Sequence, residues 1–436
     1  MKSSIIKAAG VASILTLTVG GLTACSSDST SGSGSAEGDG KVKEVEVWTW
    51  AAGYDEAAKA FNAAHDDIQI KYTQIEPGNK GGYDKIRNSI TAGNAPCLAQ
   101  VGFETLPSFV AEGNVVDVTE FASADKDLYA PAGWAGVSVG DKIYGAPQDQ
   151  GPMVLFYNKT VFEANGVAVP TTWDEYQAAG EQLKAAGVKL TGTYEDYDYS
   201  GFAWQAGAPW YEIKDGAWSI TPDSPENLEV ASYWQGLIDA DLIGAGIWSD
   251  EWSAGLGDGS IATIVGAAWF SGILKDSAAA SAGDWAVAEL PQWEAGDAKT
   301  GNVGGSLSAV LKGCDDPEAA WTVANWLSTD PGSVDSLIEG GGVYPASVAG
   351  LESELLTSGD DYFGGQVVAD VFKTASGQVN EDWAWGPGVS TLVGTLATGM
   401  KQAYAKEGGA TVATALTGAR EATESELKQQ GIAVNE

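Results

Sequence analysis

The sequence predicts an α/β fold with two lobes, each a mostly parallel sheet flanked by helices. Strand-like and helix-like segments alternate from residue 42 onward, and the later helical segments follow short connections. The roughly 400 residues beyond residue 40 exceed the size at which one hydrophobic core keeps growing, so we expect two cores. No repeat of about 20 to 50 residues occurs, which argues against a solenoid or a propeller.

The first five segments follow the order strand, helix, strand, helix, strand. Residues 42–50 are β-prone, and residues 54–64 place apolar side chains at helical spacing. The alternation continues through a strand at 68–72, a helix at 83–90 and an apolar strand at 98–103. This order predicts a parallel sheet with right-handed crossovers. Later helix starts are marked by Thr172 with Glu175, by Ser224 before Pro225 and by Asp316 before Pro317.

The first 24 residues predict a secretory signal. Lys2 and Lys7 precede an apolar run over residues 8–22 that is too short for a permanent spanning helix. The run ends in Leu22-Thr23-Ala24-Cys25, which resembles the bacterial lipobox, so we expect lipidation of Cys25. The alternative is an ordinary signal peptide with a coincidental cysteine. The expected location is extracytoplasmic, anchored to the outer face of the cytoplasmic membrane of a Gram-positive bacterium.

Residues 25–40 predict a flexible tether, because they are almost all Ser, Gly, Asp, Thr, Ala and Glu. No later stretch is long and apolar enough to span a bilayer, so the lipid is the only membrane contact that we expect.

The chain is strongly acidic. The formal net charge is −36, and removal of Lys2 and Lys7 with the signal makes it more negative still. Nucleic acid is therefore excluded as a partner, because binding of phosphates needs clustered Lys and Arg. The same field disfavours anionic solutes.

Histidine and cysteine usage limits the chemistry. His65 is the only histidine and lies in a polar turn, which excludes Ser-His-Asp hydrolysis and a histidine-based metal site; we expect it to be a solvated surface residue. We expect no metal and no cofactor. Cys97 and Cys314 are expected to form a structural disulfide, and two buried thiols are the alternative.

Three motifs in order resemble the extracellular solute-binding proteins of family 1, sugar-binding lipoproteins of ABC transporters, of which maltose-binding protein is the familiar member. The motifs are residues 142–147 (KIYGAP), 155–159 (LFYNK) and 170–175 (PTTWDE). Residues 304–308 resemble the return crossover of that family, and residues 319–327 the helix after it. At Cys97 the chain departs from the pattern, because the family usually has an aspartate there.

The resemblance implies a periplasmic-binding-protein-like fold with several hinge crossovers, whose lobes close around a solute. It places the N-terminal lobe at 41–148 plus 303–347 and the C-terminal lobe at 149–302 plus 348–436. It also implies ABC permease subunits as partners, and we expect a monomer.

Sugar recognition combines aromatic faces, which stack on axial C–H groups, with carboxylates and amides that bind hydroxyls. Such residues occur at the ends of predicted strands and at the first hinge, where solutes of α/β proteins bind. The resemblance adds the return crossover and the segments around residues 194–205, 266–270 and 380–388, where the family supplies aromatic rings. The expected ligand-binding residues are Trp50, Phe103, Glu104, Gln148, Asp149, Gln150, Asp198, Tyr199, Trp204, Trp269, Phe270, Gly305, Trp383 and Trp385.

Each of these assignments has a plainer alternative. Trp50 could lie in the core, Glu104 could be a helix N-terminal acid, and residues 148–150 could form a solvated hinge loop. Residues 194–205 could form a surface loop. Trp269 and Phe270 could exchange roles, and one of Trp383 and Trp385 is expected in the core.

We therefore expect a binding protein for a neutral oligosaccharide and not an enzyme. Two other classes remain open from the sequence. A polyamine-binding transport protein would also combine acids with tryptophans, and its binding would weaken strongly in salt. A secreted glycoside hydrolase would need two carboxyl groups at a fixed separation, which sequence spacing does not reveal.

Overall fold

The computed structural model describes residues 42–380 and 383–435. Residues from Val42 onward form one compact unit. The expected signal peptide (1–24), tether (25–40) and lipidation site Cys25 lie outside the described residues. None of the described helices is both long and apolar enough to cross a membrane.

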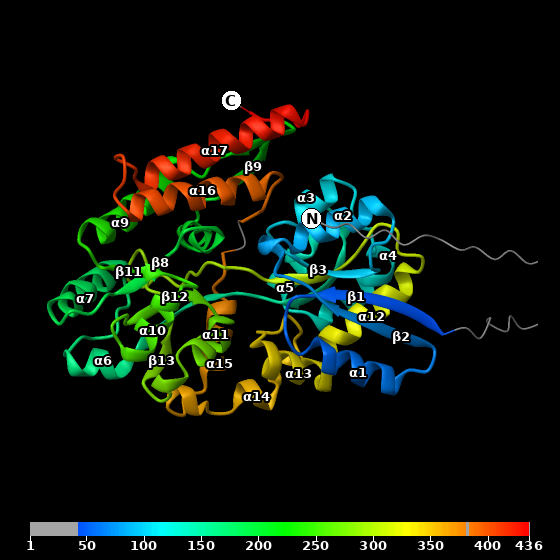
Figure 1. Ribbon diagram of the computed structural model, residues 1–436, viewed down its shortest axis with the longest axis horizontal. Helices are drawn as coiled ribbons and strands as arrows, with labels where there is room; N and C mark the ends of the chain where they lie inside the picture. The colour runs from blue at the N-terminus through cyan, green and yellow to red at the C-terminus, as the bar shows by residue number, and fades with distance from the viewer. Residues whose placement is uncertain (1–41, 381–382, 436) are drawn as a thin grey trace, which may run out of the picture. The chain divides into compact units, whose positions relative to one another are not determined.

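The first sheet has five strands in the order β2–β1–β3–β14–β6. The strands are β1 (Lys43–Thr49), β2 (Ile68–Gln74), β3 (Leu98–Gly102), β6 (Gly145–Asp149) and β14 (Ser306–Val310). Strand β1 runs parallel to β2 and β3, whereas β14 runs antiparallel to both of its neighbours, β3 and β6. Four strands therefore share one direction, and the strand that arrives from far along the chain opposes them. Strands β1, β2 and β3 of this sheet are labelled in Figure 1.

The sequence pattern explains this sheet. In β1 the side chains of Val45, Val47 and Thr49 alternate inward, as the period of a strand requires. Helices α1 (Tyr54–Ala64), α12 (Pro317–Thr329) and α13 (Pro331–Gly341) pack around it through buried faces that include Phe61 and Ala324. Helices α2 (Gly82–Ala92), α3 (Leu106–Ala111), α4 (Thr119–Ala122) and α5 (Pro131–Gly136) complete this half, with the small β4–β5 hairpin (Ser138–Val139, Lys142–Ile143).

The second sheet is mixed and consists of a three-stranded part and a parallel pair. Strand β7 (Met153–Asn158) lies between β12 (Thr263–Ala267) and β13 (Trp285–Ala288) and is antiparallel to both. Strands β8 (Thr191–Thr193) and β11 (Ile243–Gly246) pair in parallel, and a parallel bridge between Lys189 and Ile261 joins them to β12. The sheets of both halves are therefore mixed and flanked by helices, which confirms the predicted α/β class.

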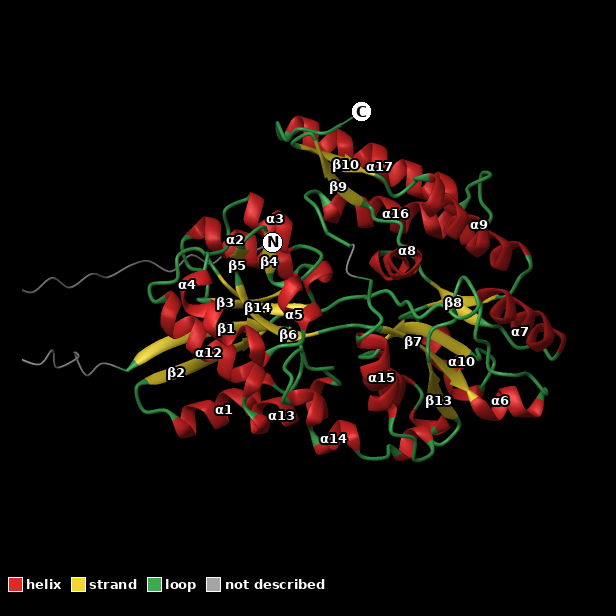
Figure 2. Ribbon diagram, turned by 180° about the vertical axis from the view of Figure 1, so that it is seen from behind, coloured by secondary structure: helices red, strands yellow, loops and turns green. Residues whose placement is uncertain are grey.

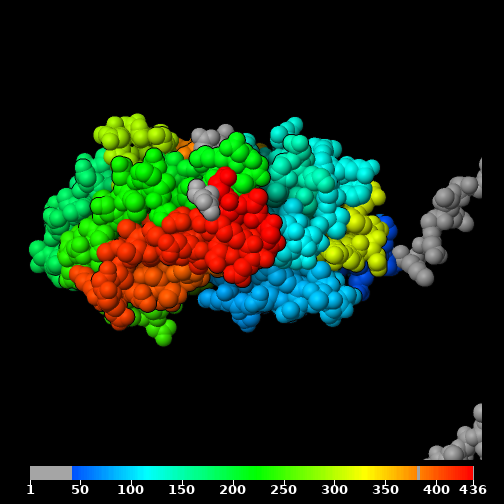
Figure 3. Space-filling view, turned by 90° about the horizontal axis from the view of Figure 1, so that it is seen from above, coloured from blue at the N-terminus to red at the C-terminus, as the bar shows by residue number. Residues whose placement is uncertain are grey.

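Helices flank the second sheet (Figure 2). They are α6 (Lys159–Ala164), α7 (Trp173–Ala185), α8 (Ser200–Ala206), α9 (Pro225–Asp239), α10 (Asp250–Asp258), α11 (Phe270–Ser277), α14 (Glu354–Thr357), α15 (Val368–Ser376), α16 (Val389–Tyr404) and α17 (Val412–Gln429). The long pair α16–α17 lies against α9, and it is seen in red in Figure 3. A hairpin of β9 (Tyr211–Lys214) and β10 (Ala217–Ile220) was not expected from the sequence.

The three predicted helix starts are confirmed. The side chain of Thr172 accepts a hydrogen bond from the Glu175 backbone at the start of α7. Ser224 caps α9 ahead of Pro225, and Asp316 caps α12 ahead of Pro317. Each cap satisfies a backbone N–H that has no partner inside its helix.

Two separate hydrophobic cores lie on the two sheets. One gathers side chains from residues 45–146 and 307–346, and the other gathers side chains from residues 153–303, from Tyr344 and from residues 362–427. The exact lobe boundaries stay a prediction.

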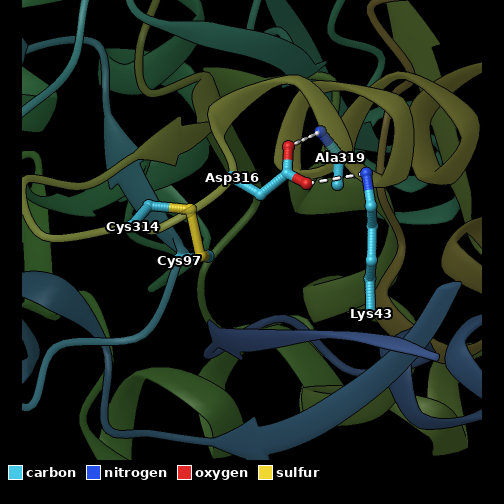
Figure 4. The surroundings of a disulfide bond; sticks show 5 residues. All are labelled: Lys43, Cys97, Cys314, Asp316 and Ala319. Atoms are coloured by element: carbon cyan, nitrogen blue, oxygen red, sulfur yellow. Dashed lines mark hydrogen bonds and ion pairs between the residues drawn. A yellow bond between two sulfur atoms is a disulfide. The ribbon is translucent and has the colours of Figure 1, made fainter. Parts of the chain in front are cut away.

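Cys97 and Cys314 form a disulfide between the start of β3 and the loop after β14 (Figure 4). Asp316, close by in the chain, accepts a hydrogen bond from the Ala319 backbone and forms an ion pair with Lys43 at 2.7 Å. The disulfide and the ion pair therefore tie the first strands of the chain to the segment that follows β14. The ring of His65 stacks on the Phe61 ring, and its Nδ1 hydrogen-bonds to the Phe61 backbone carbonyl. His65 is therefore half-buried, whereas we expected a solvated side chain.

Candidate functional site

Three chain segments run side by side between the two cores: residues 149–153, 302–306 and 343–347. The Val303 N–H donates to the Gly151 carbonyl at 2.8 Å, and the Gly151 N–H donates to the Asn302 side chain at 2.9 Å. The Gln150 N–H donates to the Tyr344 carbonyl. A Cβ at Gly151 would collide with the Val303 carbonyl, so the close approach of the first two crossovers requires glycine there.

At the end of the first sheet, Trp50 follows β1. The Gln100 side chain, on β3, accepts hydrogen bonds from the backbone N–H groups of Trp50 and Ala51. This contact holds the half-buried Trp50 at the sheet edge, where its ring meets the edge of Tyr83 at a centroid distance of 5.8 Å. Trp50 is therefore presented at the carboxyl end of the strands.

Glu104 follows β3 and is held by Tyr83. The Tyr83 hydroxyl donates to a Glu104 carboxylate oxygen at 2.6 Å and accepts from the Gly102 N–H. Burial raises the pKa of Glu104, the Tyr83 hydrogen bond lowers it by less, and the negative charge of Asp149 raises it further. Glu104 is thus a fixed acceptor close to a second carboxyl group.

The first crossover carries Gln148, Asp149 and Gln150. Burial raises the pKa of Asp149 to about 6, although the Ser306 hydroxyl donates to it across the two crossovers. Gln148 is buried and bonds Ser306 and Ser308, and the Gln150 amide donates to the Pro345 carbonyl. Asp149 is therefore the one half-buried member of this triplet, while the two buried glutamines support the crossovers.

A 3-10 turn, η3 (Tyr197–Tyr199), places acids of the second half. Asp198 is 2% exposed, and neither of its carboxylate oxygens has a hydrogen-bond partner among the described residues. Burial and the neighbouring Asp196 raise its pKa well above the usual range. Tyr199 points into the core against Phe202, away from these acids.

Three aromatic rings form a stack beside this turn. Trp269 and Phe270 lie at the start of α11, with ring centroids 4.3 Å apart. Trp248 stacks on both, 6.2 Å from Trp269 and 5.3 Å from Phe270. Trp248 is 44% exposed and has φ of 71°, a left-handed conformation that is strained for a bulky side chain. Its indole also favours the ionised form of Asp198.

These groups are connected in a ring around the crossovers. The Trp269 indole donates to the Val303 carbonyl at 3.0 Å, and a Cβ at Gly305 would meet the Phe103 ring at 2.5 Å. On the other side, the charge of Glu104 acts on Tyr197 of the second half. The structure thus brings together eight of the predicted residues: Trp50, Phe103, Glu104, Asp149, Asp198, Trp269, Phe270 and Gly305. Phe103 and Phe270 are themselves buried.

Trp204, Trp383 and Trp385 belong to another cluster. The rings of Trp204 and Trp383 stack at 4.9 Å with planes 7° apart, so each covers one face of the other. Trp385 meets Trp383 edge-on, and Trp210 packs against both. The Trp204 indole donates to the Asn380 carbonyl. These contacts favour a packing role for this set over direct stacking on a solute.

Sequence reasoning missed Trp248, Tyr83 and Tyr197. Trp248 precedes Ser249, which caps α10, and stands beside Asp250, so it has the aromatic-beside-acid composition of a loop end. That signal could have identified it. Tyr83 lies inside a helix and acts through Glu104, so no local pattern marked it.

Within residues 42–380 and 383–435, no group of three or more His, Cys, Asp or Glu side chains could hold a metal ion. Two surface hollows lie elsewhere, around Lys189 and around Pro170, and neither is lined by a predicted site residue. No lysine or arginine of the described chain forms an ion pair with Glu104, Asp149 or Asp198.

Comparison with known proteins gives consistent matches. Residues 48–333 match the model of the bacterial extracellular solute-binding protein family. An arabinooligosaccharide-binding protein of Bacillus subtilis is 27% identical over 271 residues, which is 59% of this chain and 62% of the relative's length. The match therefore spans less than two thirds of that relative.

Solved structures match over nearly the whole described chain. The galacto-N-biose-/lacto-N-biose I-binding protein of an ABC transporter from Bifidobacterium longum, in complex with lacto-N-biose, is 30% identical with a TM-score of 0.83, covering 91% of this chain and all of that one. A binding protein of B. animalis subsp. lactis, in complex with β-1,6-galactobiose, is 29% identical with a TM-score of 0.80 and the same coverage. The chain therefore belongs to the bacterial extracellular solute-binding protein family, whose members are binding components of transport systems and not enzymes.

Proposed function

We propose that this protein is the lipid-anchored substrate-binding component of an ABC importer and captures a neutral oligosaccharide between its two halves. The observation that carries this proposal is the ring of aromatic faces and carboxyl groups around the crossovers, which contains no paired cation. The family membership sets aside the glycoside hydrolase.

The aromatic stack would bind the apolar faces of sugar rings. Trp248 exposes part of its ring, and Trp269 is half-buried against the second crossover, so both offer apolar surface beside polar groups. Sugar C–H groups on such a face gain burial and stacking energy without the need for a charge.

The carboxyl groups would bind hydroxyls. Glu104 and Asp149 come from the first half, and Asp198 comes from the second. A solute that donates to acids of both halves makes contacts that exist only when the halves are together, and such differential contacts are what favours closure. We propose that permease subunits recognise the closed form of a monomeric binding protein.

The named solutes of the relatives support the sugar class. The B. subtilis relative is named for arabinooligosaccharides, and the two solved structures hold lacto-N-biose and β-1,6-galactobiose. All three are uncharged oligosaccharides, which fits a site of acids and tryptophans.

Titration calorimetry with a solute panel tests the proposal. The panel contains arabinotriose, lacto-N-biose, β-1,6-galactobiose, digalacturonate and spermidine. We expect heat from at least one neutral sugar, with a dissociation constant that changes little between low and high salt. A response to spermidine alone, weakened strongly by salt, would establish the polyamine-binding alternative instead.

The anchor needs its own test, because Cys25 lies outside the described residues. The Cys25→Ser variant should be released from washed membranes, whereas the unaltered chain should stay with them until detergent is added. Equal retention of both proteins would contradict lipidation at this cysteine.

A further inference from the structure

The side chain of Asp198 is a buried carboxyl group whose charge the surrounding protein does not compensate. Asp198 is 2% exposed, and neither of its carboxylate oxygens makes a hydrogen bond to a described residue. The backbone N–H of Asp198 donates a hydrogen bond to the side chain of Asp196 at 3.3 Å. An ionised carboxylate in such surroundings is strongly unfavourable unless donors or a cation compensate it.

The groups that face Asp198 from the surrounding elements do not compensate it. Its own turn supplies Asp196 and Tyr197, and β8 leads into Tyr194 and Glu195. The loop before α10 supplies the uncharged indole of Trp248, which lowers the pKa of Asp198 by less than burial and Asp196 raise it. From α16, Tyr404 bonds Tyr194, and Lys401, which is 66% exposed, pairs with Glu195 at 3.5 Å. Glu104 of the first half adds further negative charge near Tyr197.

We propose that Asp198 holds a proton until a sugar hydroxyl donates to it, so that solute binding releases a proton and is weakened by acid. This inference rests on the proposed function, because the hydroxyl donors come from the sugar. When the sugar binds, the proton of the Asp198 carboxyl O–H passes to the buffer. The hydrogen bond from the sugar hydroxyl then stabilises the carboxylate that remains.

The direction of the linkage follows from the two states. Burial, and then the charge of Asp196, raise the pKa of Asp198 when no sugar is bound. Hydrogen bonds from sugar hydroxyls favour the charged form and lower that pKa. The complex therefore binds fewer protons than the free protein, and affinity rises with pH through the interval between the two pKa values, by at most about tenfold per pH unit.

The experiment measures the proton directly. Calorimetric titrations with β-1,6-galactobiose, or with the panel sugar that binds best, are run at pH 7 in phosphate and in Tris. Because Tris takes up a proton with much more heat, proton release makes the observed binding enthalpy more negative in Tris. A second series follows the dissociation constant from about pH 5 to about pH 8, where perturbed acids titrate.

Two variants sharpen the test. Asp198→Asn keeps the shape and removes this titration, so the difference in heat between the two buffers should shrink and the affinity should rise less steeply with pH than in the unaltered protein. The proton exchange that remains belongs to Asp149 and Glu104, whose pKa values burial also raises. Loss of a charge-assisted hydrogen bond should weaken binding about tenfold. Asp55→Asn, at an exposed acid on α1, should behave as the unaltered protein does.

The outcomes separate the two proposals. If no panel sugar binds at any pH, the proposed function fails. If a sugar binds with equal heats in both buffers and a flat pH profile, the proton exchange at Asp198 is refuted while the proposed function stands. If Asp198→Asn does not fold, as judged by circular dichroism, the two-buffer comparison on Asp149→Asn decides, because burial raises the pKa of Asp149 to about 6 as well. Proton release that persists in Asp149→Asn supports Asp198, and proton release that disappears assigns the proton to Asp149 and refutes the proposal.

Discussion

Replacement of Trp269 by alanine should remove most of the sugar affinity. The indole stacks on Phe270 and Trp248 and is held by its hydrogen bond to the Val303 carbonyl, so its ring orientation is fixed before a solute arrives. A tryptophan buries about 150–250 Å² in full, and a sugar covers roughly a third of that, or about 60 Å². At about 25 cal/mol per Å² this contributes ~1.5 kcal/mol, and stacking adds ~0.5–1.5 kcal/mol.

The sum of ~2–3 kcal/mol corresponds to a dissociation constant raised about 30- to 150-fold. Calorimetry with the best panel sugar measures it, and thermal melting verifies that the variant is folded. Trp218→Ala is the matched control, because Trp218 is half-buried on β10, its backbone bonds the C-terminal segment, and its ring meets Tyr211. If Trp269→Ala binds sugar as tightly as the unaltered protein does, Trp269 is not a stacking residue.

Three further predictions concern the framework. Cys97→Ser should lower the melting temperature without changing sugar affinity. The disulfide closes a chain separation of 217 residues, for which the chain-entropy model gives at most ~5 kcal/mol of stabilisation. An unchanged melting curve would contradict this prediction. Gly305→Ala should lower the unfolding free energy by ~1–3 kcal/mol and weaken sugar binding, because φ is 90° and the added Cβ meets the Phe103 ring. Gly313→Ala, where φ is 96° and the added Cβ meets open space, measures the backbone strain alone. Equal losses of the two variants in denaturant unfolding would refute the Phe103 contact. Asp149→Asn should raise stability at pH 7.5 more than at pH 4.5. The pKa of Asp149 is about 6 in the folded protein and about 3.9 in the unfolded chain, so folding takes up a proton between these values and the stability of the unaltered protein falls as the pH rises through that window. Equal shifts of the melting temperature at the two pH values would count against this prediction.

The fold was largely predictable from local patterns. Alternation in β1 and helical spacing in α1 marked the first sheet, and the caps Thr172, Ser224 and Asp316 marked helix starts, because these signals depend on near neighbours in the chain. The crossovers were predictable only through the resemblance, since β14 pairs with strands about 150 to 200 residues earlier.

The site was predictable by residue type and less so by side-chain direction. Asp198 and Tyr199 are adjacent, yet one faces the acids of the site and the other enters the core. Gln148 and Asp149 differ in the same way across one peptide unit. Composition indicated that acids and aromatics meet at strand ends, but whether each points to a solute depends on packing against Phe202, Ser308 or Trp383, which lie far along the chain.

The position of β14 determines when the first sheet can finish folding during synthesis. This strand fills the space between β3 and β6, so β6 has no partner in the first sheet until residues 306–310 have been synthesised. A truncated chain that ends before the return crossover would leave two exposed strand edges, which are sites of aggregation. Neither half is therefore an independent folding unit in the order of synthesis, and a nascent chain stays without its finished first sheet until about 70% of its length has been made.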